Sequence, residues 1–65
     1  MMVWINQKSC ELQLGSTLKD AIELVPIRPP FAAAVNTQFV PKTLYHQTLL
    51  NDNDKIELIV PITGG

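Results

Sequence analysis

The chain has 65 residues, of which 46% are hydrophobic, and its formal net charge at pH 7 is -1. This length suits one small domain but leaves little room for a core together with an active-site cleft of about 300–1,000 Å³. A self-contained enzyme is therefore not expected. The 5 basic residues are scattered along the chain, whereas nucleic-acid binders cluster them.

The cellular compartment follows from what the sequence lacks. Cys10 is the single cysteine, so the chain cannot form an internal disulfide. No apolar run approaches the roughly 20 residues that span a bilayer, and the first residues do not resemble a secretion signal. We therefore expect a cytoplasmic protein.

The N-terminal segment is predicted to form a β-hairpin. Apolar and polar residues alternate over Met2–Asn6 and over Ser9–Leu14, with Gln7-Lys8 at the turn between them. Because side chains of a strand point to alternate faces, one face of each strand is apolar enough to enter a core.

A helix is predicted next. Thr17 is placed to cap it, because its hydroxyl could accept from the amide of Asp20 while the Asp20 carboxylate reaches back. Ser16 is the competing cap. The apolar spacing i, i+3, i+4, i+7 indicates a helix over Leu18–Val25, and Pro26 rules out its continuation.

The second half of the chain is predicted to be mainly extended. Lys42–Thr48 is ambiguous and could form a helical turn. Thr37 is a poor occupant of its turn if that position requires a positive φ. The remaining predicted elements are a strand at Phe31–Asn36, a turn at Asn36–Gln38, an extended segment Phe39–Pro41, a brief strand Leu49–Leu50, a turn Asn51–Asp54 and a last strand Lys55–Pro61.

One helix can cover only one face of such a sheet, so the core is expected between the helix and that face. Burying the apolar side chains on this face can offset the entropy of ordering a chain of this size, with a narrow margin. The predicted core consists of Val3, Ile5, Cys10, Leu12, Leu14, Leu18, Ile22, Val25, Val35, Val40, Ile56, Leu58 and Val60.

The informative segment lies at the C-terminus. Pro61 cannot donate to a sheet ladder, so pairing should stop there, and Ile62, Thr63, Gly64 and Gly65 then project by roughly 13–14 Å if extended. Glycines lack a Cβ, so this end could pass a narrow channel and expose its terminal carbonyl to a nucleophile. A carboxylate is a poor electrophile until it is activated, for example as an acyl-adenylate. Alternatively, terminal glycines are only frayed.

An ordered set of short segments lies at characteristic spacing along this chain. The segments are the strand ending at Asn6, Gly15-Ser16-Thr17-Leu18, Ala34-Val35-Asn36, Phe39-Val40-Pro41-Lys42, Leu50, Asp52–Leu58 and Pro61–Gly65. Together they resemble the ThiS family, the sulfur carriers of thiazole formation in thiamin biosynthesis. Two turns depart from the family pattern: its Asn-Gly reads Asn36-Thr37 here, and its Asp-Gly-Asp reads Asp52-Asn53-Asp54.

The resemblance implies an α+β, ubiquitin-like β-grasp fold. It implies a mixed sheet of four to five strands, with the first and last strands adjacent and central, and one main helix packed on one face. The domain would occupy residues 1–61, followed by a flexible Gly-Gly tail over 62–65.

The resemblance also implies the chemistry. A ThiF-like adenylyltransferase, related to ubiquitin-activating enzymes, would adenylate Gly65 with ATP and Mg²⁺. A cysteine desulfurase relay would supply sulfur, and the Gly65 thiocarboxylate would pass it to a ThiG-like thiazole synthase. The carrier itself would bind neither ATP nor metal. The alternatives are the small subunit of molybdopterin synthase and a β-grasp interaction module whose glycines do nothing.

The uncovered face of the sheet is the expected docking surface. Trp4 and Ile59 should point away from the helix, joined by Ala34 and Phe39, and exposed apolar clusters with aromatic anchors often bind partners. Alternatively, Trp4 is shielded by neighbouring loops or lies at a sheet edge. Neither Cys10 nor His46 has companions that would make a catalytic or metal site.

Overall fold

The computed structural model describes residues 1–61, so the predictions for Ile62, Thr63, Gly64 and Gly65 lie outside the described residues. The described part contains five strands, one α-helix and one 3₁₀ helix. In chain order these are β1 (Met2–Ile5), β2 (Lys8–Glu11), α1 (Leu18–Glu23), β3 (Ala32–Val35), β4 (Gln38–Val40), the 3₁₀ helix η1 (Lys42–Gln47) and β5 (Lys55–Ile59).

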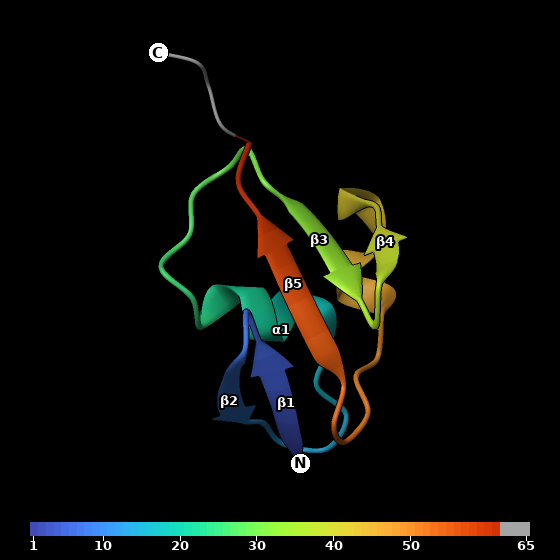
Figure 1. Cartoon of the computed structure of the whole chain (residues 1–65). Helices are drawn as coiled ribbons and strands as arrows, with labels where there is room; N and C mark the ends of the chain where they lie inside the picture. Colours follow the sequence, from blue (N-terminus) through green and yellow to red (C-terminus); the bar gives the residue numbers. More distant parts are fainter. Residues whose placement is uncertain (62–65) are drawn as a thin grey trace.

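The strands form one mixed sheet in the order β2-β1-β5-β3-β4. The first and last strands, β1 and β5, lie side by side and are parallel, whereas the other neighbours are antiparallel. Figure 1 shows β5 between β1 and β3, with α1 on one side of the sheet. This confirms the predicted α+β class, the mixed sheet and the central position of the two terminal strands.

Both antiparallel hairpins turn through two residues with positive φ. The first turn consists of Asn6 (φ 49°) and Gln7 (φ 71°), and the second of Asn36 (φ 50°) and Thr37 (φ 70°). The prediction of a turn at Gln7-Lys8 was therefore wrong by one residue, because Lys8 already pairs with Ile5. Asparagine tolerates this region of backbone space well, which suits it to the first turn position.

The helix begins as the sequence predicts. The Asp20 amide donates to the Thr17 hydroxyl at 3.3 Å, and the Thr17 amide donates to the Asp20 carboxylate at 2.9 Å. These two bonds make a capping box. The helix ends at Glu23, two residues before the predicted limit at Val25.

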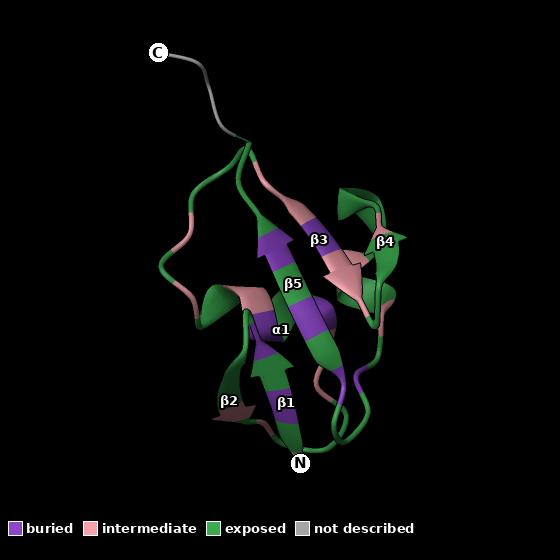
Figure 2. Ribbon diagram, viewed as in Figure 1, coloured by how far each residue is buried: buried purple, intermediate pink, exposed green. Residues whose placement is uncertain are grey.

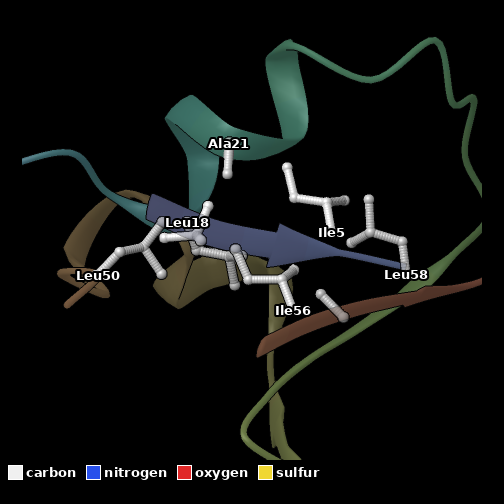
Figure 3. Close-up of a cluster of buried hydrophobic side chains, with 8 residues drawn as sticks. Ile5, Leu18, Ala21, Leu50, Ile56 and Leu58 are labelled. Carbon is white, nitrogen blue, oxygen red and sulfur yellow. The ribbon is translucent and has the colours of Figure 1, made fainter. Parts of the chain in front are cut away.

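The core lies between α1 and the sheet. Figure 3 shows the labelled side chains gathered between the helix and the strands, and Figure 2 shows buried and exposed bands alternating along β1 and β5. Ala21, Ala33 and Leu50 belong to this core although the sequence did not single them out. The buried apolar residues are Val3, Ile5, Leu18, Ala21, Ala33, Leu50, Ile56 and Leu58.

Two residues of the predicted core are exposed. Leu14 is 85% exposed and Val60 is 54% exposed. Each lies beyond the last residue of its strand, since β2 ends at Glu11 and β5 at Ile59. Once pairing stops, the backbone no longer directs alternate side chains to the core, so the alternation rule fails at these positions. The other predicted core residues that are not fully buried pack against the core from its margin: Cys10, Leu12, Ile22, Val25, Val35 and Val40.

Two leucines that the sequence placed in one core provide a matched test. Leu18→Ala should lower the free energy of unfolding by about 2–5 kcal/mol, because Leu18 is fully buried. That is a large share of the roughly 3–10 kcal/mol expected for a chain of this size. Leu14→Ala should change it by less than about 0.5 kcal/mol. Urea unfolding measures both, and equal losses would contradict the observed core.

Candidate functional site

The strand that leads to the C-terminus is the central one. β5 pairs with β1 on one side through Trp4–Lys55 and Ile5–Ile56, and with β3 on the other. It ends at Ile59, and the described chain then continues only through Val60 and Pro61. The segment 62–65 is therefore attached to the middle strand of the sheet rather than to an edge.

An asparagine side chain extends the pairing between β1 and β5. The backbone ladder of β1 stops at Ile5, and the Asn6 amide donates to the Ile56 carbonyl at 2.9 Å. Beyond it, the Asn6 side chain accepts from the Leu58 amide at 2.9 Å and donates to the Leu58 carbonyl at 3.3 Å. Asn6 thus satisfies both backbone groups of Leu58 that would otherwise lack a strand partner.

A buried carboxylate anchors the start of β5. Asp54 is only 7% exposed, and its carboxylate accepts from the Asn36 side chain at 2.9 Å and from the Asn51 amide at 2.7 Å. Asn36 also accepts from the Lys55 amide at 2.9 Å. Hydrogen bonds of this kind are what make a buried carboxylate tolerable. The sequence indicated only a turn here: the Asn51 bond lies within that turn, but Asn36 comes from a distant segment.

The outer face is defined here as the side of the sheet that points away from α1. The structure places all four predicted docking residues on this face. Trp4 is 38% exposed, Ile59 55% and Phe39 69%, and Ala34 is half-buried. Because β1 is an interior strand, Trp4 is not at a sheet edge, and its side chain is partly covered and partly open to solvent.

The strand register brings only some of these residues together. Ala34 lies directly opposite Phe39 on one side and Glu57 on the other, and Ala32 lies opposite Ile59. Cross-strand partners share a face, so Ala34 and Phe39 are direct neighbours, and Ile59 lies two residues along β5 from Glu57, the residue opposite Ala34. Trp4 lies apart from them, opposite Lys55 at the start of β5.

The outer face carries two hollows. One of about 490 Å³ lies beside Trp4 and is lined by Trp4, Asn6, Gln7, Lys55, Ile56 and Glu57. The other, of about 310 Å³, adjoins the point where β5 ends and is lined by Pro30, Phe31, Ala32, Ile59 and Pro61.

Sequence reasoning missed several residues of these hollows. Strand alternation placed Glu57 on the same face as Ile59, so the sequence could have predicted that Glu57 lies on the outer face. Pro30 and Phe31 gave no such signal, because they lie in the segment before β3, and only the fold brings them beside Ile59 and Pro61.

Within residues 1–61, no group of three or more His, Cys, Asp or Glu side chains is arranged to hold a metal ion. Neither described helix has the length and apolar character that a membrane crossing requires.

Comparison with known proteins identifies related sequences. The profile described as the ThiS family matches residues 3–65 of this chain. The sulfur carrier protein ThiS of Escherichia coli is 32% identical over an alignment of 66 residues that covers 100% of both chains. An uncharacterized protein, ycf40, of Pyropia yezoensis is 47% identical over 34 residues, which cover 52% of this chain and 48% of that protein.

A solved structure resembles the fold over its whole length. The crystal structure of the thiamine biosynthesis protein ThiS from Geobacter metallireducens superimposes with a TM-score of 0.81 and covers 100% of both chains. Its sequence is 14% identical to this chain. This likeness confirms the β-grasp architecture that was expected from the sequence.

The role of Asn6 can be tested by removing its side chain without straining the backbone. Asn6→Gly keeps a residue that tolerates the positive φ but removes both bonds to Leu58. We expect a loss of about 1–3 kcal/mol in unfolding free energy and faster hydrogen exchange at the Leu58 amide, measured by NMR. The control Gln7→Gly changes the adjacent turn residue and should leave that amide protected.

Proposed function

This chain belongs to the ThiS family of sulfur carriers, and we propose from that premise that its reactive group is the carboxylate of Gly65. In this proposal the carboxylate is converted to a thiocarboxylate that donates sulfur for thiazole formation in thiamin biosynthesis. The observation that carries the proposal is the family match, which continues through the last residue of the chain. The full-length relative that is named a sulfur carrier supports it.

The chemistry requires activation because a carboxylate has no good leaving group. The Gly65 carboxylate attacks the α-phosphorus of ATP and releases pyrophosphate, and the resulting acyl-adenylate is an electrophile. The terminal sulfur of a persulfide donor then displaces AMP to form an acyl disulfide, and a thiol cleaves its S–S bond, which leaves the thiocarboxylate and a new disulfide. ATP and Mg²⁺ are bound by the partner that catalyses these steps, and this chain is its protein substrate.

The fold supports a role in which this chain presents its C-terminus and the partner catalyses the reaction. The central strand β5 is anchored by Asp54 at its start and by Asn6 near its end, so the described body holds in place the strand that leads to the C-terminus. We propose that residues 62–65 enter the partner's site while this body stays outside it.

The partners in this proposal are a ThiF-like adenylyltransferase, a cysteine desulfurase relay that supplies sulfur, and a ThiG-like thiazole synthase that receives it. We propose that the adenylyltransferase docks on the outer face through Trp4, Ala34, Phe39 and Ile59. Trp4, Phe39 and Ile59 are exposed, which supports this surface, because burying large apolar side chains makes a large favourable contribution to the free energy of binding. The family match does not favour the small subunit of molybdopterin synthase.

The tail chemistry is tested by incubating the protein with a cognate adenylyltransferase, ATP and a sulfur donor, then measuring the intact mass. We expect the mass change of replacing one oxygen by sulfur. Deleting Gly65 should abolish this change while leaving the thermal unfolding midpoint unaltered. If partners that are active on their own carrier leave the wild-type mass unchanged, the chain is an interaction module instead.

Single substitutions of two apolar residues on the outer face test the docking proposal. Trp4→Ala and Ile59→Asp should each reduce the rate of adenylation about tenfold or more at low carrier concentration, because interface anchors commonly contribute at least 1.4 kcal/mol. Leu49→Asp is the control, since Leu49 is similarly exposed (64%) but pairs with Thr17 at the start of the helix. Wild-type rates for both face variants would exclude this surface.

A further inference from the structure

A carboxylate stands within the apolar outer face. Glu57 is the middle residue of β5, is exposed, and has Lys55 and Ile59 on the same face two residues away in either direction. Its register partner on β3 is Ala34, whose methyl group is too short to cover the carboxylate. Any partner that covers this face must therefore also cover Glu57.

The Glu57 side chain lines the larger hollow together with Trp4. Trp4 supplies an aromatic side chain to this lining, and Asn6 and Gln7 of the adjoining hairpin turn also line the hollow. Lys55 lies opposite Trp4 in the register and lines the same hollow. The volume of about 490 Å³ is ample for one long side chain of a partner.

Docking removes water from this carboxylate, and a buried carboxylate without a counter-charge is strongly unfavourable. Lys55 lines the same hollow but forms no ion pair with Glu57 within residues 1–61, so the counter-charge for Glu57 has to come from the partner. Arginine fits both components of the hollow, because its planar guanidinium stacks on an aromatic face and pairs with a carboxylate through two parallel hydrogen bonds. A lysine ammonium group is a compact charge that lacks this planar fit.

We propose that the partner docking on the outer face inserts an arginine side chain into this hollow, where the guanidinium stacks on Trp4 and pairs with Glu57. This inference rests on the proposed function, because it specifies how the same docking surface is recognised.

The first experiment measures steady-state adenylation by the cognate adenylyltransferase as a function of carrier concentration. Glu57→Gln keeps the size of the side chain and removes its charge, so we expect KM for the carrier to rise about tenfold or more while kcat stays unchanged. Glu57→Lys should raise KM further. Glu23→Gln is the matched control, since Glu23 is an exposed carboxylate on α1 and should keep the wild-type KM.

The second experiment observes the hollow directly. Trp4 is the only tryptophan in the chain, so replacing it biosynthetically with fluorotryptophan gives a single fluorine NMR signal that reports on this site. Adding the unlabelled adenylyltransferase should shift the signal of the wild-type protein, and Glu57→Lys should reduce that shift at equal partner concentration.

These experiments test the arginine inference and the proposed carrier function separately. If Glu57→Gln and Glu57→Lys retain the wild-type KM, or if the fluorine signal does not move when the partner binds, the arginine inference is overturned while the carrier function stands. If the wild-type protein is not adenylated by a partner that is active on its own carrier, the proposed function fails and the inference fails with it.

Discussion

The parallel pairing of the first and last strands is the constraint on which the rest of this structure depends. It joins the two hairpin-containing halves of the chain and places β5 in the middle of the sheet. Yet the backbone register contains only two residue pairs, Trp4–Lys55 and Ile5–Ile56. Side-chain hydrogen bonds supplement this short ladder. Asn6 bonds to Leu58, and the Asp54–Asn36 pair holds the beginning of β5. The Asn6–Leu58 bonds link residues 52 apart in the chain, and the Asn36–Asp54 bond links residues 18 apart.

A single short helix is the second constraint. α1 has six residues and covers one face of a five-stranded sheet, so within residues 1–61 no second layer covers the opposite face. In a larger α/β protein a second layer of helices would bury that face. Here the uncovered face carries exposed apolar residues, a carboxylate and two hollows beside the strand that leads to the C-terminus. The lack of a second helical layer thus leaves this surface available to a partner.

The elements that the sequence predicted best are those specified by local chemistry. The Thr17–Asp20 capping box and the alternation in β1 and β5 involve residues within a few positions of one another, and both are present in the structure. The ends of strands were predicted less well. Leu14 and Val60 were placed in the core because alternation was extended past the points where pairing stops, and pairing depends on a neighbouring strand that the local sequence does not reveal.

In the candidate site, too, some features follow from the local sequence and others only from the tertiary structure. The sequence by itself determined the α+β class, the family, and the assignment of Trp4, Ala34, Phe39 and Ile59 to the face away from the helix, because strand periodicity fixes which side chains share a face. Only the tertiary structure decided which of these residues are neighbours. The register sets Glu57 against Ala34 and brings Trp4 and Glu57 into one hollow, while the fold carries Pro30 and Phe31 to the end of β5. Register and contact between distant segments arise from packing of the whole chain, so no local pattern could specify them.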